Sequence, residues 1–486
     1  MAAKDVPYVF NSLNEATSER TILLQGSEDA TVRIRRLLST MAHQQIRLQE
    51  SNFLDRLGRT FAMLHDIPSL YKDEIKAKQG AKYIDLPSAV KQHLGLSVTE
   101  FLVIGHALIA LMKMRYDANI TISDDIRSYT AIQNTSAVKR RAEVISDVVE
   151  TSRSVRTNFT FTVQDLVLAN HSALTLENTQ KYLDLLSKTT RQLRDIVSTQ
   201  KVYSEGLIPD RLSPLERYPI VALDGSRYII PNLRHFDTAV TDIIHYILQD
   251  IYPDNAYNQL RGYVQEIYLR MYLQDRLPQL QLIPEISYRK AKNRVEGPDL
   301  TAIDIDREVL VAIESKAKRM RVVSRVHPGT NFLMEDLQGA LAAFEKLPVK
   351  IQDLYAGLPE YSVYQSSIDR TKSKAPIAVV VLGEGVYFIN ELLNDYLKND
   401  QDHFLNKYSE PYCLMRIEAF ERAIEVAASN NLSLYDLLHK YWTGSKSTNI
   451  TEASAETFAP YPITSPTLPQ RYARKFHEEY IEAFAG

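Results

Sequence analysis

The stretch PDLTAIDIDREVLVAIESK, residues 298–316, decides how the central part of this chain folds. Its apolar and β-branched residues predict two short strands, Asp299 to Ile305 and Glu308 to Lys316, separated by a polar turn. Val309 to Ile313 is apolar on both faces, which indicates a strand in the middle of a sheet. A buried strand that ends in an acid and a lysine needs a functional reason.

The end of this strand carries residues suited to phosphodiester chemistry. Side chains along a strand alternate between faces, so Glu314 and Lys316 project to one side and Ser315 to the other. An adjacent strand would bring Asp299 beside Glu314. Two carboxylates offer the hard oxygen ligands that Mg²⁺ prefers, and a neighbouring lysine can orient water or stabilise developing charge. The sequence therefore predicts a metal-dependent hydrolytic site here.

The pairing of these residues is more specific than either part alone. Pro-Asp occurs three times in the chain and acid-x-Lys twice, but only Asp299 precedes such a triplet at a hairpin-like distance on expected strands. The other triplet, Glu74-Ile-Lys76, lies in a polar helical stretch and is interpreted as a solvated face. The alternative for Glu314 and Lys316 is a surface ion pair, and for Asp299 a turn residue.

Gly-Pro-Asp299 followed by Glu314-Ser-Lys316 resembles the motif of the PD-(D/E)xK, or restriction-endonuclease-like, superfamily over roughly residues 210 to 440. The resemblance implies a restriction-endonuclease-like mixed sheet flanked by helices. It also implies Mg²⁺, with Mn²⁺ as a substitute, and hydrolytic cutting of DNA or, less often, RNA.

The same resemblance suggests two further residues. Members usually carry a glutamate on the helix before the first strand, and Gly262-Tyr-Val-Gln-Glu266 makes Glu266 the candidate third metal ligand. RecB-like members carry a glutamine on the helix after the lysine strand, and Gln338 matches that place. An exposed position is the alternative for both. Ser315 stands where an apolar residue is common, and the tyrosine that often follows the glutamine is absent, so the subfamily stays open.

The region around the motif is basic. Ser287 to Val326 holds ten Lys and Arg residues against six acids. Positive charge beside a carboxylate site suits a phosphate backbone. The side chains that we expect to contact nucleic acid follow the lysine strand: Lys318, Arg319, Arg321 and Arg325. A solvated loop is the alternative for these four.

Composition excludes several other classes of protein. The net charge of −3 gives no global field for nucleic acid, and the one cysteine, Cys413, excludes an intrachain disulfide and a Cys-based zinc site. The start lacks the order of a secretion signal, and the longest apolar run, Phe101 to Met114, is short of the roughly 20 residues of a membrane helix. A cytoplasmic protein with no membrane partner is expected. The chain also lacks Gly-Lys-Ser/Thr, His-Glu-x-x-His and Gly-x-Ser-x-Gly.

The chain is expected to fold as an α/β protein in three parts. Residues 1–205 form a mostly α-helical domain for sensing or partner binding, 206–443 the nuclease domain, and 444–486 a linker and C-terminal helix. The expected elements include a capping box at Ser97–Glu100, a helix from Thr175 through Leu193, a hairpin around Asp224-Gly225, a strand Ile283 to Tyr288, a helix Phe332 to Leu347 and a strand Ile377 to Leu382.

Two functions follow from these features. The first is a metal-dependent nuclease that cuts DNA, with a setting in microbial restriction or anti-phage defence implied by resemblance to such two-part proteins. Its partners would be DNA, a second copy of the chain, or a defence-system protein bound by the helical domain. The alternative is a catalytically silent restriction-like fold that serves DNA binding or protein assembly.

Overall fold

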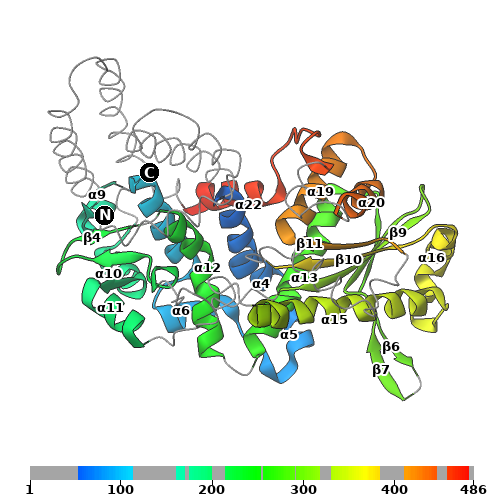
Figure 1. The fold of residues 1–486 in the computed structure, drawn as a ribbon, viewed down its shortest axis with the longest axis horizontal. Coiled ribbons are helices and arrows are strands. Elements are labelled where there is room, and N and C mark those ends of the chain that lie inside the picture. Colours follow the sequence, from blue (N-terminus) through cyan, green and yellow to red (C-terminus); the bar gives the residue numbers. More distant parts are fainter. Residues whose placement is uncertain are drawn as a thin grey trace, which may run out of the picture. The chain divides into compact units, whose positions relative to one another are not determined.

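The computed structural model describes residues 53–112, 160–169, 174–199, 214–231, 233–252, 255–290, 292–317, 330–383, 410–445 and 457–480. The chain divides into two compact units, Met1–Leu54 and Asp55–Gly486, and the elements discussed below belong to the second unit. Their fold is mixed α/β, as the sequence predicts (Figure 1).

A five-stranded mixed sheet forms the centre of this unit, in the order β11-β10-β9-β8-β5. β9 is the middle strand and pairs antiparallel with β8 and parallel with β10, which confirms the prediction from its two apolar faces. β5 runs antiparallel to β8, and β11 runs parallel to β10. The strands are β5 (Gln281–Pro284), β8 (Leu300–Asp304), β9 (Val309–Lys316), β10 (Ile377–Leu382) and β11 (Tyr412–Arg416).

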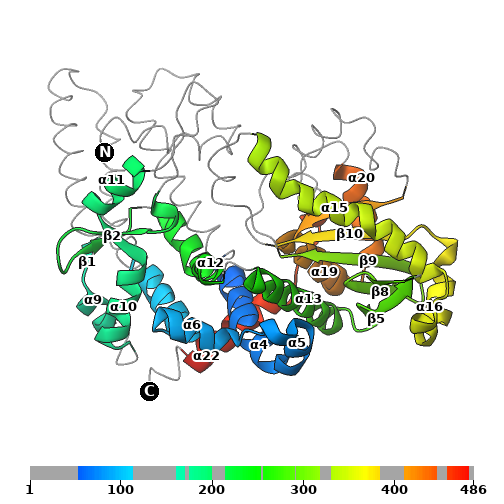
Figure 2. The ribbon, with the colours of Figure 1, turned by 90° about the horizontal axis from the view of Figure 1, so that it is seen from below.

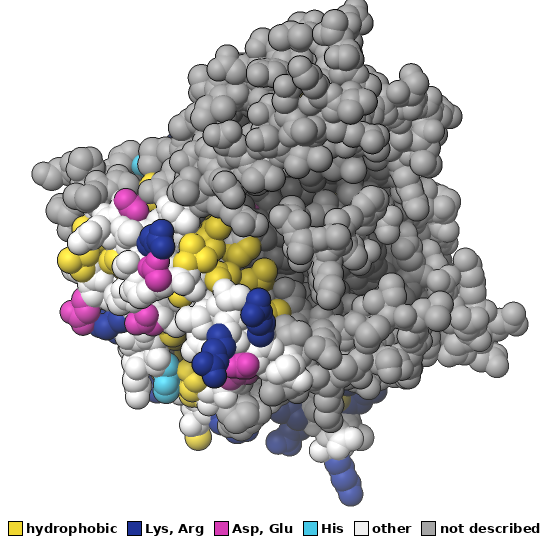
Figure 3. All heavy atoms as spheres, turned by 60° about the vertical axis from the view of Figure 1, so that its left-hand side comes forward, with side chains coloured by type: hydrophobic (Ala, Val, Ile, Leu, Met, Phe, Trp, Pro, Cys, Tyr) yellow, Lys and Arg dark blue, Asp and Glu magenta, His cyan; other side chains and the backbone are white. Residues whose placement is uncertain are grey.

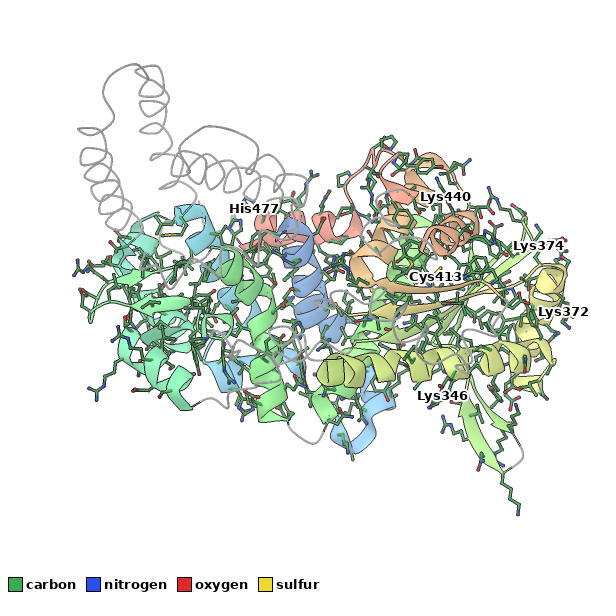
Figure 4. The ribbon with its side chains drawn as sticks, in the orientation of Figure 1. Lys346, Lys372, Lys374, Cys413, Lys440 and His477 are labelled. Atoms are coloured by element: carbon green, nitrogen blue, oxygen red, sulfur yellow. The ribbon has the colours of Figure 1, made fainter. Side chains whose placement is uncertain are left out.

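Helices cover both faces of this sheet (Figure 2). On one face lies α15 (Thr330–Tyr355), whose Phe344 and Leu347 are buried with Leu310 of β9. On the other face lie three helices, which are α13 (Ala256–Arg276), α19 (Ile417–Asn430) and α20 (Leu434–Ser445). Cys413 of β11 lies inside this second layer, where its Sγ donates a hydrogen bond to the Leu438 carbonyl oxygen at 3.3 Å (Figure 4).

A second, four-stranded sheet has the order β1-β4-β3-β2. The hairpin expected around Asp224-Gly225 is confirmed, because β3 and β4 pair antiparallel on either side of it. The expected boundary after residue 205 falls between two neighbours in this sheet, since β2 precedes it and β3 follows it. The strands are β1 (Thr160–Phe161), β2 (Ser187–Thr189), β3 (Ile220–Ala222) and β4 (Tyr228–Ile229).

The remaining described elements are mostly helices. The capping box is confirmed, since Glu100 N donates to Ser97 Oγ at 3.1 Å and Ser97 N to Glu100 Oε2 at 2.7 Å. No single helix within the described ranges is long and apolar enough to span a bilayer, although the bent pair Leu86–Leu94 and Val98–Met112 passes by length and composition. These helices are α4 (Ile67–Leu70), α5 (Lys72–Gln79), α6 (Leu86–Leu94), α9 (Val163–Ala169), α10 (Leu176–Leu186), α11 (Thr190–Thr199), α12 (Leu233–Ile251), α16 (Gln365–Arg370) and α22 (Leu468–Tyr480).

Two predicted elements are wrong in detail. The strand expected over Ile283 to Tyr288 is two strands in different sheets: β5 ends at Pro284, and β6 (Ser287–Lys290) pairs with β7 (Asn293–Glu296) in a separate hairpin. Proline has no amide hydrogen to continue the ladder, so the chain leaves the central sheet there. The helix expected to reach Leu193 is broken, because β2 separates α10 from α11.

Candidate active site

The pairing of β8 with β9 places the two motif carboxylates side by side. Leu300 is the register partner of Ile313, so Asp299 and Glu314 are the next residues along their strands at the same end of the sheet. Asp299 Oδ2 accepts a hydrogen bond of 2.7 Å from the backbone N–H of Ser315. This bond ties the Asp299 side chain to β9 just before β8 begins. The arrangement is the one expected from the alternation of side chains.

Two lysines hold the Glu314 carboxylate, one on each oxygen. Lys316 Nζ lies 2.7 Å from Oε1, and Lys350 Nζ lies 2.8 Å from Oε2. The Glu314 side chain is 7% exposed, so its charge is largely removed from water. Lys350 comes from α15, 36 residues after Glu314, and sequence reasoning missed it. Its signal is weak, because α15 carries two lysines, Lys346 and Lys350, and spacing alone does not show which of them reaches the strand.

A second ion-pair group adjoins the first and includes Glu266 of α13. Lys78, from α5, places Nζ 2.7 Å from Glu266 Oε2 and 3.3 Å from Glu285 Oε2. The same ammonium lies 4.9 Å from the centre of the Tyr263 ring. The third carboxylate expected from the resemblance therefore lies at this end of the domain, with a cation that the sequence did not indicate.

Burial and neighbouring carboxylates raise the pKa of two acids at the site. Burial, together with the charges of Glu314 and Glu266, raises the pKa of Asp299 well above its usual range, against the opposing effect of Lys316 and Lys350. Burial also raises the pKa of Glu266, although Lys78 counteracts it. Glu314 and Glu266 act on Asp299 because they lie close to it. A cation bound beside Asp299 would oppose this shift and favour its ionised form.

Lys316 and Lys78 are held in their charged form. Burial alone would lower the pKa of Lys316, but the Glu314 and Asp299 carboxylates outweigh it and the pKa is raised. In the same way, Glu266 and Glu285 outweigh burial and raise the pKa of Lys78 to about 12. Charged lysines can stabilise an anion or orient water, but they do not act as a base at neutral pH.

Ser315 points to the opposite face of the sheet, as the alternation predicts. Gln265 of α13, which is buried, donates from Nε2 to Ser315 Oγ at 3.0 Å. The polar residue in the middle of the triplet thus has a buried partner from the neighbouring helix. This bond fixes α13, and with it Glu266, against the strand that carries Glu314 and Lys316. Gln265 is a second residue that sequence reasoning missed.

The structure does not describe the side chains of several expected site residues. Gln338 belongs to α15, but its side chain is not among the described ones. The four basic residues after the lysine strand, Lys318, Arg319, Arg321 and Arg325, also fall outside the described ranges. Their roles therefore stay predictions.

The described ranges contain no group of three or more His, Cys, Asp or Glu side chains that stands ready to hold a metal ion. Ammonium groups pair with both oxygens of Glu314 and with one of Glu266. Protein-family models, curated proteins and solved structures were compared with this chain, and none matches it. The function is therefore inferred from the residues and geometry of the chain itself.

Proposed function

We propose that this protein is a metal-dependent nuclease that hydrolyses phosphodiester bonds of DNA, with Asp299, Glu314 and Lys316 at its active site. One observation carries the proposal, which is the strand register that places Asp299 and Glu314 side by side with Lys316 bonded to Glu314. A buried ion pair is costly to form and seldom needed for stability. A cluster of three acids and three lysines at the end of a central strand is better explained by function.

The donor chemistry of the cluster fits a hard divalent cation. Asp299, Glu314 and Glu266 would hold Mg²⁺, or Mn²⁺ in its place, through carboxylate oxygens. When bound, such an ion supplies charge neutralisation on the phosphate and a more acidic water. The lysines now paired with these oxygens have long side chains, partly exposed at 33% for Lys316 and 28% for Lys78, and can turn aside.

The chain's own cations have a distinct part in this reaction. Lys316, kept protonated by its carboxylate neighbours, lies where it can bind a phosphate oxygen and stabilise the charge that develops on it. Lys350 is buried more deeply, at 14% exposure, and holds the second oxygen of Glu314 in place. We assign Lys316 the catalytic role, whereas Lys350 neutralises Glu314 in the metal-free protein and competes with a metal for its second oxygen.

The central mixed sheet with helices on both faces supports a restriction-endonuclease-like fold, and we propose that assignment together with the nuclease activity. The setting that we favour is microbial restriction or anti-phage defence in the cytoplasm, in which the helical part binds an activating partner or a second copy of the chain. This setting rests on the resemblance in architecture alone.

A cleavage assay tests the proposal. Purified protein is incubated with plasmid, linear and single-stranded DNA and with RNA, in Mg²⁺, Mn²⁺ or EDTA. We expect metal-dependent cutting that Asp299→Asn and Lys316→Met each reduce by about a thousandfold. Matched controls are Asp306→Asn, in the exposed turn at the other end of the same strands, and Lys372→Met, an exposed lysine beside α16 (Figure 4). Cutting that persists in both site variants contradicts the proposal.

A second candidate is a silent restriction-like fold that binds DNA without cutting it. Its supporting observation is that lysines already pair with the carboxylate oxygens that a metal would use. DNA binding without cleavage in any metal, unaffected by Asp299→Asn, favours this candidate.

A further inference from the structure

The hairpin of β6 and β7 stands apart from both larger sheets. The hairpin lies between β5 and β8 in the sequence. Its second strand is followed closely by Asp299, so its base adjoins the proposed active site. In Figure 1 the two strands project from the layered body of the domain. Four of its residues are basic and exposed: Arg289, Lys290, Lys292 and Arg294.

The two faces of the hairpin differ in character. Tyr288 is buried and Val295 packs against the core, so the face that they share is the inner one. Arg289 and Arg294 are direct cross-strand partners on the opposite, outer face. Like charges placed opposite each other destabilise a strand pair. Arg294 also bonds Ser287 Oγ at 2.9 Å, but neither arginine has a carboxylate partner among the described residues.

The hairpin is bonded to helix α15 and closed at its base. Tyr288 donates its hydroxyl hydrogen to Asp353 Oδ2 at 2.8 Å, and Lys290 Nζ lies 2.7 Å from Oδ1 of the same residue. Gly297 N donates to the Ile286 carbonyl oxygen at 2.9 Å and closes the base. A side chain at Gly297 would strike the Tyr361 hydroxyl, which lies 2.1 Å from an added Cβ. The basic outer face is therefore presented on a fixed support.

Helix α15 links the hairpin to the active site. Lys350 bonds Glu314, and Asp353 bonds the hairpin. Asp353 is three positions after Lys350, which is about 4.5 Å along the helix axis. Lys346, one turn before Lys350, is exposed, and Figure 4 shows it on the side of α15 from which the hairpin projects.

We propose that the β6–β7 hairpin is a DNA-binding ribbon that contacts the backbone of a double helix through Arg289 and Arg294 while the cut strand lies at Asp299 and Glu314. This inference rests on the proposed nuclease function. A two-stranded ribbon fits a groove of duplex DNA, and guanidinium groups bind phosphate with two hydrogens at once. Lys292, beside the turn, is exposed and has no bonded partner among the described residues, so it lies free for a further phosphate.

Fluorescence anisotropy with a labelled duplex in EDTA tests this proposal without cleavage. For Arg289→Ala/Arg294→Ala we expect roughly tenfold weaker binding than for the wild type. The slope of log affinity against log salt should become shallower by about two, one unit for each lost phosphate contact. Arg289→Lys/Arg294→Lys should recover most of the affinity, since it keeps the charge.

The matched control is Arg191→Ala/Arg194→Ala on α11, which removes two exposed arginines elsewhere. On the face of the small sheet and its helices, acidic and basic side chains are interspersed, and we expect less than a twofold change (Figure 3). Unchanged duplex affinity and salt slope in the hairpin variant, in a wild type that cuts DNA, overturn the hairpin proposal alone. A wild type that neither binds nor cuts DNA overturns the proposed function as well.

Discussion

Helix α13 carries polar side chains into two buried charge clusters that differ in construction. The active-site cluster consists of Asp299, Glu314, Glu266, Lys316, Lys350 and Lys78. The arginine cluster consists of Arg59, Glu421, Tyr268, Tyr272, Glu425 and Arg276. Both place carboxylates among apolar layers, where an unpaired charge is costly. They differ in which cation neutralises the carboxylates and in how completely it does so.

In the arginine cluster, every carboxylate is held by a fixed donor. Arg59 donates from Nε and Nη2 to the two oxygens of Glu421 at 2.7 and 2.5 Å, and the Tyr268 hydroxyl donates to Glu421 at 2.6 Å. Glu425 accepts from Tyr272 at 2.9 Å and from Arg276 at 2.7 Å. The Arg59 side chain is 1% exposed. These bonds join the helical run over residues 55–70 to α13 and α19.

In the active-site cluster, single-point lysine contacts take the place of arginine forks. Lysine is a compact charge on a flexible stem and is displaced more readily than a bidentate guanidinium group. The three lysine side chains keep 14% to 33% of their surface exposed. The arginine cluster is therefore a fixed structural element. In the active-site cluster, a bound cation or phosphate can displace the lysines from the carboxylates.

Breaking the arginine cluster should have the largest effect on stability. Arg59→Met leaves Glu421 buried without its main partner, and we expect a loss of about 3 to 5 kcal/mol in the free energy of unfolding. Chemical denaturation measures it. The control is Arg270→Met, which removes a partly exposed pair with Glu74 and should cost about 1 kcal/mol or less. Equal, small losses in the two variants would show that the buried Arg59 pair stabilises the fold no more than a partly exposed pair does.

Removing a charge from the active-site cluster should instead raise the free energy of unfolding. Asp299→Asn keeps an oxygen to accept the Ser315 N–H but removes one of the mutually repelling charges. The metal-free protein should gain on the order of 1 kcal/mol while cleavage is lost. Denaturation in EDTA measures the gain, with Asp306→Asn as the control. A destabilised Asp299→Asn protein contradicts the claim that this cluster is strained.

The pH dependence of that gain follows from the raised pKa of Asp299. Its value in the unfolded chain is near 3.8 and its value in the folded protein is higher, so the folded state binds the proton more tightly. The penalty is therefore absent below the unfolded pKa and grows as the pH rises toward the folded pKa. The difference in stability between Asp299→Asn and the wild type should vanish below the unfolded pKa and reach its full size above the folded pKa.

Removing one competing lysine should have the smallest effect. Lys350→Met frees Glu314 Oε2 from its ammonium partner, and Mg²⁺ should then bind a few-fold more tightly, a gain of about 1 kcal/mol or less. Calorimetry measures the affinity. Lys346→Met, on the same helix but exposed, is the control and should change nothing. Weaker Mg²⁺ binding in Lys350→Met would mean that this lysine supports the metal site rather than competing with it.

Much of the central sheet is predictable from local sequence. The apolar run Val309–Ile313 and the spacing from Asp299 to Glu314 are enough to give β8, β9 and the neighbouring carboxylates, because strand alternation and hairpin pairing are local rules. β7 was missed, since Asn293–Glu296 is polar and its pairing depends on a support supplied by α15. β11 was missed for a similar reason, because its partner β10 lies far away in sequence.

The cations of the site show the limit of such rules. Lys316 is two residues from Glu314 and was predicted from the alternation. Lys350 and Lys78 reach the same cluster from a distant helix and from the N-terminal half of the chain, 36 and 188 residues from the acids that they bind. Only the packing of α15 and α5 against the domain brings them there, and no local pattern encodes it.

Calorimetric titration of Mg²⁺ into the protein tests the central claim most directly, since the claim is that the active-site cluster holds a metal. The wild type should bind Mg²⁺, Glu314→Gln should bind at least about tenfold more weakly, and Asp306→Asn should match the wild type. Wild-type protein that binds no Mg²⁺ and no Mn²⁺, or a Glu314→Gln variant that binds as tightly as the wild type, would contradict it.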